Sequence, residues 1–296
     1  MRGRTLLRGY LFPLAVGIAL FCLVRFTLRT ERGSYWARLL KISRGQDDFS
    51  SIFGLPMESI KLTEAIRRQL KLPATLLQPY NLRRPHLKSF SQHAQDRLAA
   101  EIFKNQKGLY FVEVGALDGE TMSNTLYLER ELGWKGLLIE PTPAIFDRMI
   151  AKNRKTVGLN ACLSPNKTAM ELPFRQVTLD AKYNGLVMEG ENVTRSNVSS
   201  TTILVPCYPF YNILEAVGNP IVDFLSLDIE GAELEVLKTI PWDKVKIRLI
   251  CVEVIHTQGG EDAVKSFLKE KGYTFLLTKK FDSYFYKTDL ASGMSV

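Results

Sequence analysis

The sequence predicts an α/β fold with a doubly wound, mostly parallel sheet, and three observations carry this prediction. From about residue 109 onward, short apolar runs rich in β-forming residues alternate with helical stretches. These runs are apolar at nearly every position, which is typical of strands covered on both faces. Glycines and acidic residues gather where the runs end, and ligands of such sheets bind outside the carboxyl ends of the strands.

The expected strands and helices follow from these runs and from the residues that end them. In chain order, strands are expected at Leu109–Val114, Lys135–Glu140, Val157–Leu163, Val222–Ile229 and Ile247–Ile255, with a closing antiparallel pair at Tyr273–Thr278 and Ser283–Lys287. Helices are expected near Met57–Leu72, Gln92–Gln106 and Leu126–Leu132, and at Pro143–Asn153, Ala232–Ile240 and Glu261–Lys271. Gly133 and Pro143 mark a helix end and a helix start, the usual places of these residues. The polar, aperiodic stretch Gln176–Leu204 is expected as a long surface loop.

The chain ahead of the α/β domain divides into a membrane anchor and a tether. We expect a basic region with a transmembrane anchor in residues 1–28, a tether with short helices in residues 29–90, and the α/β domain in residues 91–290. The uncharged run Gly9–Val24 would span about 24 Å as a helix, slightly less than the hydrocarbon core of a bilayer. A cleaved signal peptide and a buried soluble helix are the alternatives, although no small-x-small cleavage site follows Val24.

Charge and cysteine content exclude several classes of protein. The net charge is +8, but residues 1–50 hold nine Lys or Arg against three acidic residues, so the remainder is nearly neutral. A nucleic-acid-binding face is therefore not expected. Four cysteines without a CxxC pair argue against a disulfide scaffold and against a structural zinc site. Cys162 and Cys207 would form a disulfide in an oxidising lumen, or else remain two free thiols.

The side of the membrane on which the domain lies stays open from the sequence. Three arginines precede the apolar run and six Lys or Arg follow it, a distribution that would keep the C-terminal domain cytoplasmic. Three glycosylation sequons, at Asn166, Asn192 and Asn197, favour the lumenal side instead, although each would also suit a polar loop.

Residues at the first two strand ends indicate a nucleoside-binding site. Gly115 and Gly119 would let the backbone approach a ligand, and Glu140 could bind both hydroxyls of a ribose. Their GxxxG spacing lacks the GxGxxG of a pyrophosphate-binding turn, so a nucleoside without pyrophosphate is expected. In the plainer reading, the glycines serve only a tight turn, Glu113 caps a helix and Glu140 is a solvated strand end.

A second polar group follows the two later strands. Asp228 and Glu230 lie on one strand face, and Glu253 and His256 end the next strand. Asp228 or His256 could take the proton from an acceptor hydroxyl. Capping of the following helix by Asp228 and Glu230 is the competing reading. Carboxylates with an imidazole could also bind a cation, but no metal site is predicted.

The segments FVEVGALDGE, GLLIEP, DFLSLDIEGAELEVLKTI and ICVEVIH together resemble the FkbM-type S-adenosylmethionine-dependent methyltransferase domain, over about residues 90–288. The stretches SNTLYLERELGWKGLLIEP and VPCYPFYNILEAVG narrow the resemblance to an animal subgroup that includes the insect protein Star. The resemblance implies a Rossmann-like fold of the class I methyltransferase type and S-adenosylmethionine as cofactor.

The resemblance also implies roles for individual residues. Glu113, Gly115 and Gly119 would lie against the methionine part of the cofactor, and Glu140 would bind the ribose hydroxyls. Ala161 and Cys162 would flank the adenine, while Asp228 and Glu230 would lie beside the position of methyl transfer. The chain departs from the family on the acceptor side, where Val205-Pro-Cys-Tyr stands in place of a Thr-Leu-Asp. It also departs in the first loop, which reads GALDG rather than starting with GAN.

Two functions of different classes follow, and the sequence leaves open whether catalysis is retained. The first is a membrane-anchored O-methyltransferase acting on a hydroxylated acceptor such as a glycan. The second is a non-catalytic, Star-like membrane protein of the endoplasmic reticulum, Golgi or endosomes, acting in the trafficking of growth-factor precursors and in EGF-receptor signalling. Its partner would be a membrane protein of the secretory pathway. Fold alone does not decide between them.

Overall fold

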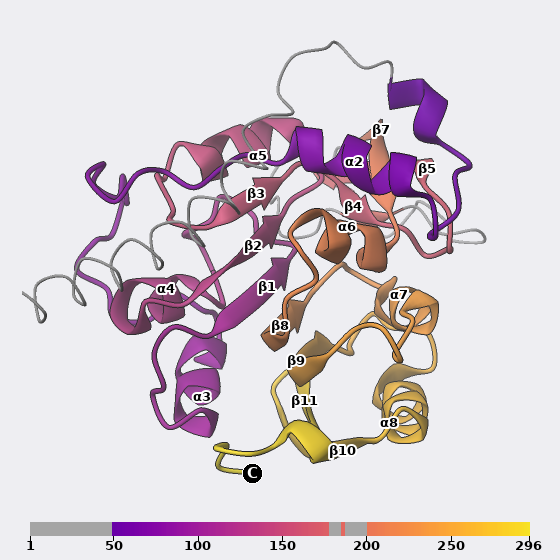
Figure 1. Ribbon diagram of the computed structural model, residues 1–296. Coiled ribbons are helices and arrows are strands. Elements are labelled where there is room, and N and C mark those ends of the chain that lie inside the picture. The colour runs from indigo at the N-terminus through magenta and orange to yellow at the C-terminus, as the bar shows by residue number, and fades with distance from the viewer. Residues whose placement is uncertain (1–48, 178–184, 187–199) are drawn as a thin grey trace, which may run out of the picture. The chain divides into compact units, whose positions relative to one another are not determined.

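The computed structural model describes residues 49–177, 185–186 and 200–296 (Figure 1). The described residues belong to one compact unit. The expected membrane anchor and the sequons at Asn192 and Asn197 lie outside the described residues. Within the described ranges, none of the helices has the length and apolar character needed to cross a bilayer.

The central sheet confirms the predicted doubly wound architecture. Its seven strands have the spatial order β10-β11-β9-β8-β1-β2-β3. They are β1 (Tyr110–Val114), β2 (Lys135–Ile139), β3 (Val157–Leu159), β8 (Val222–Leu227), β9 (Ile247–Glu253), β10 (Tyr273–Lys279) and β11 (Asp282–Lys287). All neighbours are parallel except β11, which pairs antiparallel with both β9 and β10. The strand order reverses between β1 and β8, so a cleft is expected outside their carboxyl ends.

Helices cover both faces of this sheet (Figure 1). On one face lie α3 (Gln95–Ile102), α4 (Leu126–Leu132) and α5 (Pro143–Ile150), and on the other α6 (Phe210–Ala216), α7 (Glu233–Thr239) and α8 (Gly260–Glu270). The core beneath the first three helices is largely aromatic, with Phe103 edge-on to Trp134 and Phe111 paired with Phe224 across β1 and β8. Because both sheet faces are buried, the strands read as continuous apolar runs rather than as alternating ones.

A second, four-stranded sheet was not predicted. It has the order β4-β7-β5-β6, formed by β4 (Cys162–Leu163), β5 (Met170–Val177), β6 (Gly185–Leu186) and β7 (Ser200–Tyr208). The expected strand Val157–Leu163 is therefore split, since its first half joins the central sheet and its last two residues join this one. The expectation of a loop through Gln176–Leu204 is wrong at its two ends, where β5 and β7 pair antiparallel.

The residues expected as a tether, from 49 to 90, pack on the domain. They form η1 (Phe49–Ile52) and α2 (Ile60–Gln69), which begins at Ser59, whose hydroxyl caps the backbone N–H of Leu62. Leu62 and Ile66 are fully buried, and the guanidinium of Arg67 donates to the carbonyls that end α6. This segment therefore belongs to the same compact unit as residues 91–290.

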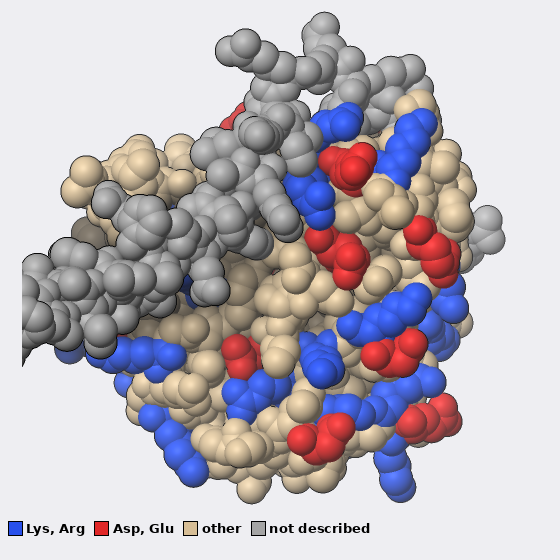
Figure 2. Space-filling view, viewed as in Figure 1, with Lys and Arg blue, Asp and Glu red and all other residues tan. Residues whose placement is uncertain are grey.

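Basic and acidic side chains are interspersed on the side of the molecule shown in Figure 2.

Candidate functional site

A cavity of about 360 Å³ lies outside the carboxyl ends of β1, β2, β8 and β9. This is the switch point of the strand order, where ligands of doubly wound sheets bind. Of the site residues expected from sequence, nine line the cavity: Glu113, Gly115, Glu140, Ala161, Cys162, Asp228, Glu230, Glu253 and His256. Gly119 does not line it. The second sheet closes one side with Cys162, Phe174 and Leu186.

Glu140 follows the last residue of β2 and is almost completely buried. Its carboxylate accepts the backbone N–H of Leu117 at 3.1 Å and that of Thr142 at 2.8 Å. Asn160 fixes the same strand end by donating its amide to the Glu140 carbonyl at 2.8 Å. Burial raises the pKa of Glu140 to about 7, and the two N–H donors only partly offset this effect. The carboxylate of Glu140 is therefore held rigidly at the cavity wall. A ligand that donates hydrogen bonds to it would lower its pKa.

The carboxylate of Glu113 is hydrogen-bonded to other residues of the protein. Its carboxylate accepts the hydroxyls of Ser123 and Thr125 and the backbone N–H of Asn124, the last at 2.6 Å. These residues form the turn into α4, so Glu113 shapes this turn, which is close to its plainer sequence interpretation. Burial raises the pKa of Glu113, and the charge of Arg154 opposes this rise.

The two glycines of the first loop serve close packing within the protein. Gly115 has φ +83°, and a Cβ placed there would collide with the carbonyl oxygen of Asp228. Gly119 has φ +73°, and its Cβ would lie 2.8 Å from the side chain of Met149. The plainer interpretation of the loop therefore accounts for both glycines, while Gly115 also borders the cavity.

Replacing Gly115 by alanine is expected to lower the free energy of unfolding by about 2–4 kcal/mol. The left-handed backbone conformation disfavours alanine, and its Cβ would collide with the carbonyl oxygen of Asp228. Gly108→Ala is the matched control, because Gly108 has φ +74° but has open space around its Cβ position. This control should lose about 1 kcal/mol. Urea denaturation of both variants measures the difference, and equal losses would show that the collision relaxes at no cost.

A second part of the cavity brings together acids and a histidine at the ends of β8 and β9. His256 Nδ1 lies 3.0 Å from Glu230 Oε2 and 3.4 Å from Glu253 Oε2. Burial, followed by repulsion from Glu253, raises the pKa of Asp228 well above its usual range. Burial and the neighbouring charge of Glu230 raise the pKa of Glu253 to about 8. One carboxylate oxygen each of Asp228, Glu233 and Glu253 lie within 4.8 Å of one another, and this crowding of acids away from water favours their protonated forms.

Capping of α7 by Asp228 and Glu230 is not observed. The carboxylate of Glu233, which is fully buried, instead accepts the backbone N–H groups of Ile229 and Gly231 at 2.9 and 3.0 Å. It also accepts the Thr257 hydroxyl at 3.0 Å, which ties the loop after β8 to the loop after β9. Asp228 and Glu230 are thereby left to face the cavity.

The same group offers atoms that could bind a divalent cation. One oxygen each of Glu230 and Glu253 and a nitrogen of His256 lie within 4.8 Å of one another. The imidazole of His256 pairs with the carboxylates of Glu230 and Glu253 without a cation. We assign no metal to it.

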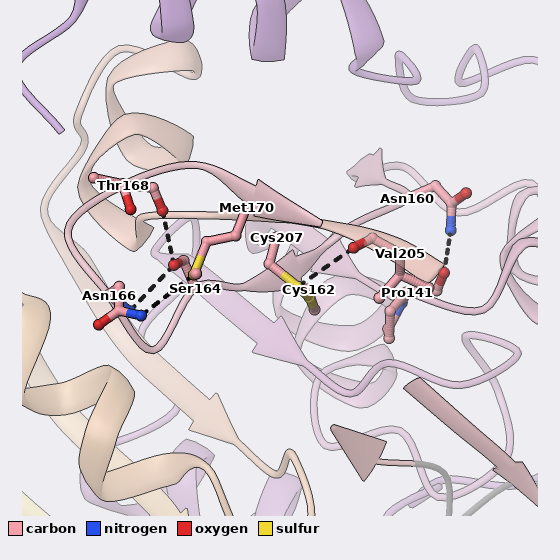
Figure 3. Close-up of a disulfide and its surroundings, with 9 residues drawn as sticks. All are labelled: Pro141, Asn160, Cys162, Ser164, Asn166, Thr168, Met170, Val205 and Cys207. Carbon is pink, nitrogen blue, oxygen red and sulfur yellow. Dashed lines mark hydrogen bonds between the residues drawn. A yellow bond between two sulfur atoms is a disulfide. The ribbon is translucent and has the colours of Figure 1, made fainter. Parts of the chain in front are cut away.

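A disulfide joins Cys162 and Cys207, which decides between the two alternatives that the sequence left open (Figure 3). The two residues are direct partners in the parallel pair β4–β7, and their Cα atoms lie 4.4 Å apart. Cys162 also lines the cavity, as does Ala161. The bond therefore fixes the wall where the family resemblance would put the adenine.

Several cavity residues were missed from the sequence. Asn124 donates its side-chain amide to the Ser226 hydroxyl at 2.9 Å, and Gln95 donates to Asp282 at 2.9 Å. Phe281, from the turn between β10 and β11, also lines the cavity. Gln95 and Phe281 carry no motif that would have identified them. Ser226, on the same strand face as Asp228, could have been included.

Comparison with known proteins places this site in a family. The family model described as the Methyltransferase FkbM domain matches residues 113–275, more than half of the chain. No curated protein matches.

Solved structures that resemble the chain share few of its residues. The precorrin-6y C5,15-methyltransferase from Geobacter metallireducens GS-15 is 13% identical, with 65% of this chain and 87% of that chain covered and a TM-score of 0.37. A SAM-dependent methyltransferase from Aquifex aeolicus is 11% identical, with 66% of this chain and 90% of that chain covered and a TM-score of 0.32. The N-terminal domain of human METTL16 is 14% identical, with 83% of this chain and 91% of that chain covered and a TM-score of 0.34.

The family match begins at Glu113, at the end of β1, and extends into β10. It therefore spans the glycine loop, Glu140, the disulfide-linked wall and the acidic group that line the cavity. The chain belongs to the FkbM methyltransferase domain family.

Proposed function

We propose that the protein transfers a methyl group from S-adenosylmethionine to a hydroxyl of an acceptor such as a glycan. The observation that carries the proposal is the rigid, buried carboxylate of Glu140 at the end of β2, in a cavity bordered by the loop after β1. A carboxylate in this place binds ribose hydroxyls in nucleoside-binding sheets.

The charge of the cavity fits the proposed cofactor. Among the described residues that line it, none is Lys or Arg. Five are acidic: Glu113, Glu140, Asp228, Glu230 and Glu253. S-adenosylmethionine carries a positive sulfonium, and a cation in a partly desolvated cavity would favour the ionised form of these acids and be attracted by it. The volume lies within the range of small-molecule sites.

The acceptor side supplies the means of removing a proton. The bound cofactor would supply an electrophilic methyl group on its positively charged sulfur. Asp228 and Glu253 both line the cavity, and their raised pKa values suit a carboxylate that takes the proton of an acceptor hydroxyl. His256, in contact with Glu230 and Glu253, can pass the proton toward solvent because its side chain is partly exposed. Most of the acceleration would come from alignment of the hydroxyl in this confined site.

Calorimetric titration of the full chain with S-adenosylmethionine tests the proposal. We expect binding that Glu140→Gln weakens about 10- to 100-fold, because the variant loses hydrogen bonds to a charged acceptor. Glu131→Gln, an exposed position on α4, is the control and should bind as the unaltered protein does. Thermal unfolding should show that both variants are folded.

The same titration should depend on pH. Without ligand, Glu140 is protonated below its pKa of about 7, whereas binding of ribose hydroxyls favours the ionised carboxylate. Affinity should therefore be full above pH 7 and fall as pH falls through 7, by about tenfold from pH 8 to pH 6. In Glu140→Gln the part of the slope that belongs to Glu140 should disappear.

A folded protein without measurable affinity for S-adenosylmethionine would contradict the proposal. The non-catalytic, membrane-anchored role that the Star-like resemblance implies would then be the remaining candidate, with a membrane protein of the secretory pathway as its partner.

A further inference from the structure

The sequon Asn166-Lys167-Thr168 lies in the turn that connects β4 to β5. Ser164 organises this turn, because its hydroxyl donates to the Thr168 carbonyl at 2.8 Å and accepts the Asn166 backbone N–H at 3.1 Å (Figure 3). Asn166 is exposed, and among the residues that the structure describes its side-chain amide donates only to the sulfur of Met170, at 3.3 Å. Sulfur is a weak acceptor, so little would be lost if this nitrogen carried a substituent.

The turn is also fixed from its other side, which makes it a stable place for a bulky group. The backbone N–H of Met57 donates to the Lys167 carbonyl at 2.8 Å, and Gly54 donates to the Ala169 carbonyl at 2.8 Å. These bonds use backbone atoms alone. A group attached to the Asn166 amide nitrogen would therefore leave the hydrogen bonds of the turn intact.

The disulfide four residues before Asn166 points to the compartment in which the domain folds. Cys162 and Cys207 are both buried, so the bond is enclosed within the folded domain rather than formed on its surface. Such bonds form and persist in the lumen of the secretory pathway and are rare in the cytosol. Asparagine glycosylation at N-x-Ser/Thr occurs on proteins that enter this same lumen.

We propose that Asn166 carries an N-linked glycan and that the methyltransferase domain lies on the lumenal side of a secretory-pathway membrane. An exposed, weakly engaged sequon and an enclosed disulfide are independent observations that require the same compartment. The assignment is opposite to the orientation that counting of basic residues around the apolar run favours. It does not rest on the proposed methyl transfer.

The full chain, expressed in animal cells with Asn192→Gln and Asn197→Gln to remove the other two sequons, tests the proposal. This background should migrate as a glycoprotein on a gel and shift to higher mobility after treatment with peptide N-glycosidase. Thr168→Ser keeps the sequon and should keep the shift, whereas Thr168→Ala and Asn166→Gln should abolish it. Because Thr168→Ala leaves Asn166 in place, it separates glycosylation from any other effect of the asparagine.

A second measurement tests the compartment separately. In cell lysates prepared with a thiol-blocking reagent, Cys162 and Cys207 should resist labelling until the protein is denatured and reduced. A contrary result would be a background variant that is secreted or membrane-associated and yet shows the same gel mobility with and without the glycosidase. That result would contradict a glycan at Asn166. Free thiols at both cysteines in denatured, unreduced protein would overturn the lumenal assignment.

Discussion

Arg154→Met is expected to lower the free energy of unfolding by about 3–5 kcal/mol, since it leaves buried charge without its partner. Arg154 and Glu129 are both buried, and their side chains meet at 2.8 Å. The guanidinium also donates to the Gly119 carbonyl at 2.6 Å and to the Thr125 hydroxyl at 3.1 Å. Thr125 in turn donates to Glu113. The substitution therefore removes support from the first loop as well as from α4.

The matched control is Lys238→Met, which breaks an exposed ion pair. Lys238 and Glu235 lie 3.0 Å apart on α7, and both side chains are substantially exposed. The loss should stay below about 1 kcal/mol. Guanidinium denaturation of both variants gives the comparison. Replacing Arg154 and Glu129 together by apolar residues should restore part of the loss, because no buried charge then remains at that position. Similar losses for Arg154→Met and Lys238→Met would contradict this account of the network.

Loss of the Cys162–Cys207 disulfide is expected to cost about 4 kcal/mol, because the bond restricts the unfolded chain over a separation of 45 residues. Cys162→Ala with Cys207→Ala should lower the denaturation midpoint, and treatment of the unaltered protein with a reductant should have a similar effect. Affinity for S-adenosylmethionine should fall too, since Cys162 is part of the cavity wall.

Cys251→Ala is the control for the disulfide experiment. Cys251 is a buried free thiol in β9, so its replacement removes a side chain of the same size but no crosslink. The midpoint of this variant should respond to the reductant as fully as that of the unaltered protein. A midpoint of the unaltered protein that is the same with and without reductant would contradict the expected contribution.

The central sheet could be predicted because the apolar residues that identify each strand lie within that strand's own sequence. Val222–Leu227 is buried at every position and four of its six residues are apolar, which identifies it as a strand covered on both faces. The second sheet was missed for the opposite reason. Met170–Val177 alternates apolar and polar residues and contains Pro173, which weakens the signal for a strand. Its partner β7 lies well apart from it in sequence, so only the folded structure reveals the pairing.

The candidate site divides in the same way. Glu140, Asp228 and Glu230 follow strands that are parallel neighbours or near neighbours, so their gathering at one edge follows from topology. The competing interpretation, in which Asp228 and Glu230 cap the following helix, is wrong, because Glu233 is the residue whose carboxylate accepts the loop N–H groups. Phe281 reaches the cavity from the C-terminal hairpin, a distance along the chain that no local pattern spans.

The acidic lining of the cavity has a consequence for turnover. Methyl transfer converts a positively charged sulfonium into a neutral thioether, while the carboxylates of the wall stay where they are. Their attraction for the ligand therefore falls at the moment the reaction is complete. A wall without Lys or Arg among its described residues would release the spent nucleoside more readily than it holds the fresh one, which would limit inhibition by product.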